Sequence, residues 1–186
     1  MRIVGGEFRG RTLKGPSTMS VRPTSDRLRE SLFNIISHAY GDVLEGARVI
    51  DLFAGTGALG LEALSRGARF ALFVDDGAEA RALLRANVDS LGVGGRTKVF
   101  RRDATKLGAM PPGEAHTLAF LDPPYGRGLA PLALTSLRDG GWLAPGAVVI
   151  VEEAATADVE PPEGYNLIER RAYGDTQVMF LHAAQA

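Results

Sequence analysis

The four residues Asp122-Pro123-Pro124-Tyr125 could carry out chemistry on a bound ligand. They follow an apolar run, Thr117 to Leu121, which predicts a buried strand. The strand must end at Asp122, because a proline lacks the N–H that a strand inside a sheet donates. Open α/β sheets bind ligands at the carboxyl ends of their strands, and the two prolines hold Tyr125 and the Pro123 carbonyl rigidly beside the carboxylate. We therefore predict an active-site loop, although Asp-Pro also opens many ordinary turns.

A glycine motif predicts a nucleotide site nearer the N-terminus. Gly55-x-Gly57-x-x-Gly60 follows the apolar run 48–53 and opens a predicted helix, which fits the dinucleotide fingerprint. Glycines at these positions let the backbone pass close to a ligand. Asp75 ends the next predicted strand, where a carboxylate can bind both ribose hydroxyls, and Asp103, at the tip of the third, is within reach of an adenine amino group. These residues indicate a cofactor that contains adenosine, for either hydride or methyl transfer.

The position of Asp51 favours methyl transfer over hydride transfer. It lies inside the predicted strand, two residues after Val49 and before the glycines. In a dinucleotide site the first glycines face a pyrophosphate, which a nearby carboxylate would repel. A carboxylate suits a cation instead, such as the amino group and sulfonium of S-adenosylmethionine, and hydride transfer does not need the Asp122 loop. We therefore expect S-adenosylmethionine, in contact with Asp51, Phe53, Ala54, Gly55, Gly57, Asp75, Asp103, Ala104 and Asp122.

The elements that position these residues alternate between strands and helices from residue 47 onward. The sequence predicts strands over 48–53, 70–74, 97–101, 117–122 and 147–151, and helices from the glycine turn to 65, over 78–91 and over 129–137. Such alternation predicts an α/β fold whose mostly parallel sheet carries helices on both faces, a Rossmann-like doubly wound arrangement. Segments 166–171 and 176–182 predict a closing antiparallel hairpin. Glu152, at the end of the fifth strand, is either an acid that supports the site or, as we favour, a surface acid, and we expect Trp142 to pack under a loop.

The N-terminal residues form a basic segment. Residues 1–30 contain seven basic and three acidic side chains, a net charge of +4, although the whole chain has a net charge of −1. This asymmetry favours a polyanion contact on one face. Gly5-Gly6 predicts a short β-hairpin, with Phe8 as its anchor, and a helix then starts at Thr24 as N-cap and ends near Tyr40. We expect residues 1–20 to be an extension of a domain formed by residues 21–186.

The composition restricts the class of protein. The chain has 186 residues and no cysteine, which rules out disulfides and cysteine-based zinc sites. Its three histidines are far apart and lack ligand spacing, so we expect no metal site. No apolar segment has the length of a membrane span. A cytoplasmic protein without a membrane partner, and a monomer, are the default expectations.

Two sets of residues resemble a known family. Asp51-Leu52-Phe53-Ala54-Gly55-Thr56-Gly57-Ala58-Leu59-Gly60, together with Asp122-Pro123-Pro124-Tyr125, resembles the amino-methyltransferases that act on exocyclic nucleobase nitrogens. Gly5-Gly6-Glu7-Phe8-Arg9-Gly10-Arg11 and the segment from Arg22 to Asn34 narrow the resemblance to the bacterial 16S rRNA guanine-N2 methyltransferases, over nearly the whole chain. That family usually has glutamate at the position of Asp75, whose shorter side chain keeps the same hydrogen-bonding capacity.

The resemblance implies a class I methyltransferase that transfers a methyl group from S-adenosylmethionine to N2 of a guanine in 16S rRNA. The substrate would be the rRNA within the small ribosomal subunit or an assembly intermediate. Asp122 and the Pro123 carbonyl would accept hydrogen bonds from the amino group, Tyr125 would stack on the base, and Thr24 and Arg27 would close the methionine end of the cofactor. The candidates for RNA phosphate contacts are Arg2, Arg9, Arg11, Lys14 and Arg22.

Three other functions fit parts of the pattern. A DNA methyltransferase acting on adenine N6 or cytosine N4 would use the same chemistry, but such enzymes normally carry a target-recognition region, and no insertion here is large enough. A catalytically idle RNA-binding or assembly factor would not need the Asp122 loop together with Asp51, Asp75 and Asp103. A small-molecule methyltransferase would not need the basic N-terminal segment.

Overall fold

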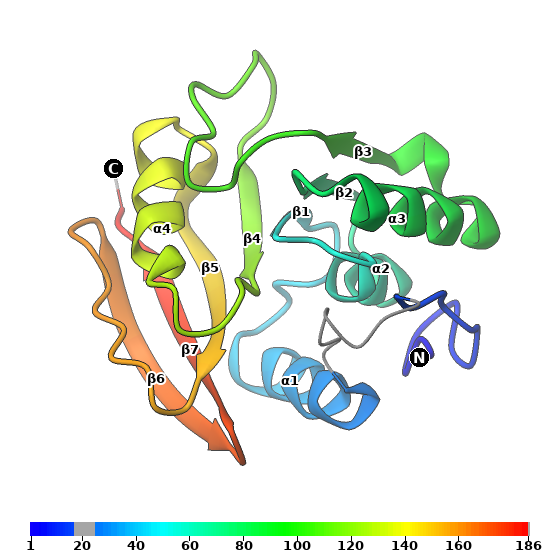
Figure 1. The fold of residues 1–186 in the computed structure, drawn as a ribbon, viewed down its shortest axis with the longest axis horizontal. Helices are drawn as coiled ribbons and strands as arrows, with labels where there is room; N and C mark the ends of the chain where they lie inside the picture. The colour runs from blue at the N-terminus through cyan, green and yellow to red at the C-terminus, as the bar shows by residue number, and fades with distance from the viewer. Residues whose placement is uncertain (17–24, 186) are drawn as a thin grey trace.

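A computed structural model of the chain describes residues 1–16 and 25–185. One seven-stranded sheet crosses the described part in the order β3-β2-β1-β4-β5-β7-β6 (Figure 1). The strands are β1 (Arg48–Leu52), β2 (Phe70–Val74), β3 (Thr97–Phe100), β4 (His116–Leu121), β5 (Leu143–Ala154), β6 (Tyr165–Tyr173) and β7 (Thr176–Ala183). The helices are α1 (Asp26–Ala39), α2 (Ala58–Ser65), α3 (Ala78–Leu91), the 3₁₀-helix η1 (Gly94–Arg96) and α4 (Leu129–Asp139).

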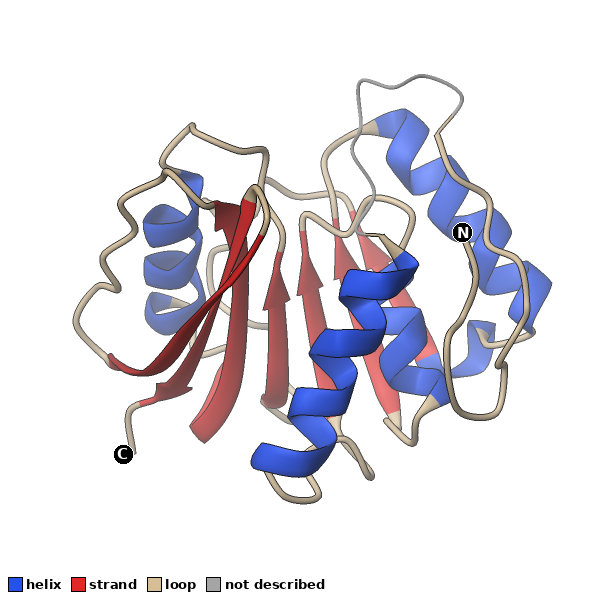
Figure 2. Cartoon of the chain, turned by 90° about the horizontal axis from the view of Figure 1, so that it is seen from below, coloured by secondary structure: helices blue, strands red, loops and turns tan. Residues whose placement is uncertain are grey.

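The sheet is parallel from β3 to β5, and β7 and β6 join it as an antiparallel hairpin. Helices cover both faces (Figure 2). Apolar residues of α1, α2 and α3 pack on one face, and those of α4 pack on the other. The strand β1 is buried on both faces because Val49 points to the first core and Ile50 to the second. The predicted doubly wound α/β fold with a C-terminal hairpin is confirmed.

The structure corrects the predicted N-cap of the first helix and the predicted extent of the fifth strand. The N-cap of α1 is Ser25, whose hydroxyl accepts a hydrogen bond from the Leu28 N–H at 3.1 Å; Thr24 itself lies outside the described residues. The fifth strand extends beyond the predicted 147–151 at both ends, because Leu143 pairs with His116 of β4 and the pairing with β7 continues to Ala154.

The N-terminal segment closes into a loop without regular strands. Arg2 and Thr12 form a single antiparallel bridge. Beside it, the Ile3 N–H donates to the Arg11 carbonyl at 2.9 Å and the Leu13 N–H donates to the Met1 carbonyl at 2.8 Å, so the predicted short hairpin is present as a minimal ladder. The backbone N–H groups of Val4 and Gly5 also donate to the Glu62 carboxylate of α2, at 2.8 and 2.9 Å. The hairpin is therefore attached to α2, and the predicted boundary between residues 20 and 21 lies outside the described residues.

The Glu62 carboxylate also joins two helices. It is fully buried and accepts hydrogen bonds from Arg29 of α1 at 3.2 Å and from Arg66, which follows α2, at 2.8 Å. A buried carboxylate must be paired in this way, because the loss of its water would otherwise be very costly. One side chain thus fixes the N-terminal loop and α1 against the helix that follows the glycine turn.

The rest of the molecule agrees with two smaller expectations. Phe8 packs against the core below the loop, and Trp142 is buried with its indole N–H donating to the Gly108 carbonyl at 2.9 Å. Within residues 1–16 and 25–185, no helix combines the length and apolar character needed to cross a membrane.

Candidate active site

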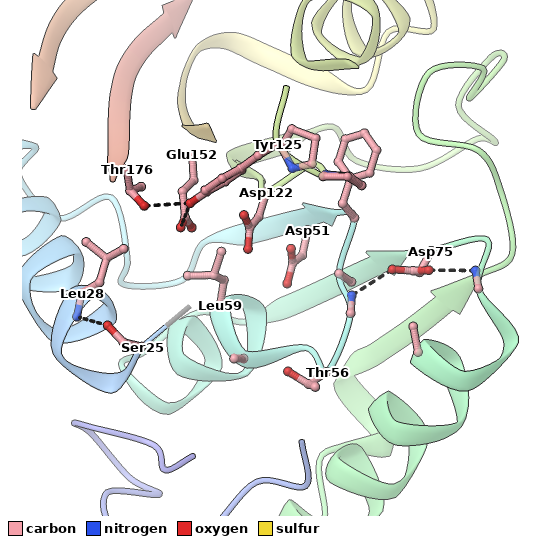
Figure 3. A pocket seen from close by; sticks show the side chains of 18 of the residues that line it. Ser25, Leu28, Asp51, Thr56, Leu59, Asp75, Asp122, Tyr125, Glu152 and Thr176 are labelled. Carbon is pink, nitrogen blue, oxygen red and sulfur yellow. Dashed lines mark hydrogen bonds between the residues drawn. The ribbon is translucent and has the colours of Figure 1, made fainter. Parts of the chain in front are cut away.

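A cavity of about 1110 Å³ opens at the carboxyl ends of the parallel strands (Figure 3). Most of the residues predicted for the cofactor and the catalytic loop line it together: Arg27, Asp51, Phe53, Ala54, Gly55, Asp75, Asp122, Pro123, Pro124 and Tyr125. Sequence reasoning missed other lining residues, among them Ser25, Asp76, Glu152, Tyr173 and Thr176. The structure therefore joins the glycine turn and the Asp122 loop in one site.

The sheet register places the acidic residues on one face. Side chains alternate between the two faces along a strand. Asp51 follows Val49, and Asp75 follows Phe73, on the face that packs against α1, α2 and α3. Asp122 follows Phe120 on the same face. Because all these strands are parallel, the carboxylates meet at one edge of the sheet, as Figure 3 shows for Asp51 and Asp122.

The Asp51 carboxyl group is the most deeply buried of these acids. It is 1% exposed, and its Oδ2 accepts a hydrogen bond from the Gly60 N–H at 3.0 Å. Burial raises the pKa of Asp51 to about 8; the Gly60 N–H opposes this shift, and the nearby Asp75 carboxylate adds to it. A cation in the cavity would favour the ionised form and reverse the shift. Asp51 is therefore suited to a positively charged ligand.

The Asp75 carboxylate organises the glycine turn. Its Oδ2 accepts from the Gly55 N–H at 2.9 Å and its Oδ1 from the Gly77 N–H at 2.8 Å. Each carboxylate oxygen has two acceptor sites, so both oxygens retain the capacity to bind hydroxyl groups. The Asp75 carboxylate can therefore hold the glycine turn and still accept hydrogen bonds from the ribose hydroxyls that the sequence analysis assigned to it.

Backbone geometry in the turn is unusual. Phe53 has φ of +59°, a conformation that non-glycine residues rarely adopt and that is typical of functional sites. Gly60 is required for a different reason: a β-carbon there would lie 2.4 Å from the Phe73 ring. Gly57 does not line the cavity; it caps α2 with φ of +83°. The first glycine thus faces the ligand space, and the other two allow α2 to pack closely on the sheet.

The loop after β4 is held by two glutamates of β5. The Tyr125 hydroxyl donates to Glu152 Oε1 at 3.0 Å and shares a hydrogen bond with the Thr176 hydroxyl at 2.8 Å. Burial raises the pKa of Tyr125, so its hydroxyl stays protonated at neutral pH. The Gly126 N–H donates to Glu153 Oε1 at 3.0 Å. The tyrosine ring is therefore fixed in position at the wall of the cavity.

Glu152 is not the surface acid that we predicted. It is 7% exposed, lies within β5 and lines the cavity beside Asp122. The available signal was the alternation of Val148, Ile150 and Glu152, which continues the buried face of the strand by one more residue.

Asp103 lies farther from the sheet than predicted. The strand β3 ends at Phe100, so Asp103 is three residues beyond its tip. Its Oδ1 accepts from the Thr105 hydroxyl at 2.7 Å and from the Thr105 N–H at 2.8 Å, and these bonds lower its pKa. Asp103 and Ala104 line a small pocket that shares Phe53 and Asp75 with the main cavity. The two cavities are contiguous at the end of β2.

The basic N-terminal side chains differ in their surroundings. Arg2, Arg9, Arg11 and Lys14 are exposed, whereas Arg29 is buried against Glu62. Arg22 lies outside the described residues. The Lys14 backbone bonds to Asn87, whose amide also donates to the Thr56 carbonyl in the glycine turn at 2.9 Å. The exposed basic residues therefore belong to a loop that lies next to the cavity.

Comparisons with known proteins agree with this geometry. The family model described as "Conserved hypothetical protein 95" matches residues 1–182. Ribosomal RNA small subunit methyltransferase D of Escherichia coli strain K12 is 42% identical over 153 residues, which cover 82% of this chain and 74% of that protein. The chain belongs to this methyltransferase D family.

Other members of the family are similar over most of their length. Ribosomal RNA small subunit methyltransferase D of Haemophilus influenzae is 31% identical over 176 residues, covering 94% of this chain and 89% of that protein. The solved structure of the Escherichia coli protein YhhF has a TM-score of 0.83 and 33% identity, and covers 99% of this chain and 98% of that chain. The present chain, as a member of the methyltransferase D family, has the Rossmann-like class I methyltransferase fold.

We predict that replacing Asp51 changes how stability depends on pH. The folded state keeps this carboxyl protonated up to about pH 8, whereas the unfolded chain releases the proton near its ordinary value of 3.8. The folded state therefore loses stability as pH rises between these values. Asp51→Asn removes this titration. As pH increases between these values, the free energy of unfolding of Asp51→Asn should therefore increase relative to that of the original chain, by up to about 1.4 kcal/mol per pH unit.

Urea unfolding at several pH values between about 5 and 8 measures this difference. An Asp158→Asn variant, which changes an acid outside the cavity, provides the control. A difference between Asp51→Asn and the original chain that does not vary with pH would contradict the buried titration.

Proposed function

We propose that this protein transfers a methyl group from S-adenosylmethionine to the exocyclic N2 of a guanine in 16S rRNA. The observation that carries the proposal is the single cavity in which a buried carboxylate suited to a cation, Asp51, lies beside the rigid Asp122-Pro-Pro-Tyr125 loop. The names of the family members from Escherichia coli and Haemophilus influenzae support ribosomal RNA as the substrate class.

The cavity fits this cofactor. Its volume is sufficient for a cofactor and a nucleobase together, since drug-sized ligands occupy pockets of about 300–1,000 Å³. Asp51 would face the cationic methionine portion, Gly55 would let the backbone pass close to it, and Asp75 would bind the ribose. Asp103 and Ala104 would contact the adenine from the adjoining pocket. S-adenosylmethionine supplies the methyl group on a sulfonium, which needs no metal ion.

Arg27 lies at the mouth of the cavity, on the first turn of α1. We propose that it helps to close the methionine end of the cofactor, together with Thr24. The neighbouring Ser25 and Leu28 also line the cavity, so the start of α1 contributes to its wall.

Asp122 and the Pro123 carbonyl would act on the guanine amino group. The lone pair of this nitrogen is delocalised into the ring, so the nitrogen is a poor nucleophile. Hydrogen bonds from its two protons to the carboxylate and the carbonyl would draw it toward tetrahedral geometry and aim the lone pair at the methyl group. Much of the acceleration would come from this positioning. As the new N–C bond forms, the bond between the methyl carbon and the sulfonium sulfur would break and leave S-adenosylhomocysteine, and the extra amino proton would then pass to the Asp122 carboxylate and on to water.

Tyr125 would hold the base that Asp122 acts on. A base must leave its stack to reach a pocket of this kind, and stacking on an aromatic side chain contributes about 1–3 kcal/mol per base. Because Glu152 and Thr176 fix the hydroxyl, the ring would need no reordering when the base arrives.

The direct experiment is transfer of labelled methyl from S-adenosylmethionine to total RNA, isolated small subunits and duplex DNA. The recipients should come from cells that lack the gene, so that the target position is unmodified. We expect label in 16S rRNA that is recovered as N2-methylguanosine after digestion. Label on DNA adenine or cytosine would overturn the substrate, and cofactor binding without any transfer would indicate an idle RNA-binding factor.

We also predict a salt-dependent contribution from the exposed basic residues Arg2, Arg9, Arg11 and Lys14, which we propose contact RNA phosphates with Arg22. Replacing Arg9 and Lys14 by glutamate should weaken binding of 16S rRNA and reduce the slope of log affinity against log salt concentration. The slope should fall by roughly 0.7–0.9 for each phosphate that the variant no longer neutralises.

Binding of the rRNA at several salt concentrations gives this slope. Arg138→Glu is the control, because Arg138 is partly exposed on α4, which packs on the other face of the sheet from the N-terminal loop. An unchanged slope in the double variant, or an equal change in the control, would mean that the N-terminal loop does not bind the phosphates.

A further inference from the structure

Glu152 lies directly beside Asp122 in the sheet. In the parallel pairing of β4 and β5, Phe120 pairs with Ile150 and Leu121 with Val151, so Asp122 and Glu152 follow in the same register. Paired residues of parallel strands point to the same face, and neighbouring strands are about 4.7–4.9 Å apart. The two carboxylates therefore enter the cavity side by side, and Figure 3 shows both of them facing it.

The Glu152 carboxylate, whose position is set by its register in β5, also holds the loop that follows β4. Its Oε1 accepts the Tyr125 hydroxyl at 3.0 Å, and the same hydroxyl is held from the other side by Thr176. A carboxylate has about four acceptor sites on its two oxygens, so Glu152 can accept a hydrogen bond from a ligand in addition to the one from the tyrosine. A base stacked on Tyr125 with its amino group at Asp122 would thus have Glu152 next to its edge.

The edge of guanine beside N2 has a distinctive chemistry. The ring nitrogen N1 carries a proton and lies next to the carbon that bears the amino group, so N1 and N2 present neighbouring donors. Two adjacent carboxylates can accept from both. Adenine has no proton on N1, and its lone pair there would face the Glu152 carboxylate. A site built to accept a hydrogen bond rejects a ligand that lacks the donor more strongly than an apolar site would.

We infer that Glu152 selects guanine by accepting a hydrogen bond from N1–H while Asp122 holds the amino group. The inference rests on the proposed function, and it adds the residue that determines which base is accepted. Glu152 would then have two tasks, because it also positions Tyr125. Base selection and support of Tyr125 predict different results with a substrate base that lacks the proton on N1.

The test uses 2-aminopurine, which keeps the amino group at the same carbon but has no proton on N1. After the labelled guanine has been located, 16S rRNA is ligated from a transcript and a synthetic oligonucleotide that carries guanine or 2-aminopurine at that position. We expect the original enzyme to prefer guanine. Glu152→Gln presents an amide N–H to the unprotonated N1, so the ratio of kcat/KM for guanine to that for 2-aminopurine should fall at least about tenfold.

Two variants separate base selection from support of the loop. Glu153→Gln removes the neighbouring buried carboxylate, which holds Gly126 and lies on the other face of the strand, and it should leave the ratio unchanged. Tyr125→Phe removes the hydroxyl that Glu152 accepts, so it should lower both rates without changing their ratio. Cofactor affinity of each variant serves as the check on folding.

The outcomes distinguish this inference from the proposed function. An unchanged ratio in Glu152→Gln, with guanine still methylated by the original enzyme, would overturn base selection alone. A ratio that falls equally in Tyr125→Phe would show that Glu152 acts only through the tyrosine, which also overturns it. Absence of methyl on guanine with the original enzyme would overturn both proposals.

Discussion

The parallel register of β2, β1, β4 and β5 is the constraint on which the site depends. Each of these strands ends at the same edge of the sheet, and each places a carboxylate there on the face that packs against α1, α2 and α3. A shift of one residue in any strand would turn its acid to the opposite face, where α4 packs. The apolar residues that bury the sheet on both faces therefore also determine where the chemical groups lie.

Much of this arrangement was predictable because clear sequence signals mark where the strands and helices begin and end. The strand Phe70–Val74 and the helix Ala78–Leu91 have the predicted bounds, since an apolar run stops at two acids and a glycine precedes the helix. The Asp122 loop was recognisable because two prolines end the strand. Clustering of the predicted cofactor and loop residues in one cavity follows from the general position of ligands in such sheets.

The parts that sequence reasoning missed depend on long-range contacts. Glu152 was assigned to the surface because an acid after an apolar run usually ends a strand, but pairing with β7 extends β5 and buries it. The N-terminal glycines indicated a hairpin but not its attachment to α2, in which the N–H groups of Val4 and Gly5 bind Glu62, a residue distant in sequence. One of the seven basic residues counted in the N-terminal charge, Arg29, is buried in an ion pair with Glu62, which the sequence did not indicate.

The acidic residues give the cavity one side that suits a cation and another side that suits the reacting base. Asp51 is buried behind the glycine turn and suits a cation, whereas Asp122 and Glu152 lie at the loop side, next to an aromatic ring that is fixed by hydrogen bonds. Glu62 stabilises both sides indirectly, because it joins α1 and the N-terminal loop to α2. We propose that Asp51 binds the cofactor and that Asp122 binds the reacting amino group. Mutations at these two positions should therefore affect cofactor binding and methyl transfer separately.

The most direct test of that assignment is the single-turnover rate of methyl transfer by Asp122→Ala, with cofactor and 16S rRNA both saturating. The account predicts a loss of at least about 100-fold, in the range found for positioned acid–base groups, with the affinity for S-adenosylmethionine changed by less than about threefold, a difference of under about 1 kcal/mol. A rate close to that of the original enzyme would contradict the central claim that Asp122 positions the amino group for transfer.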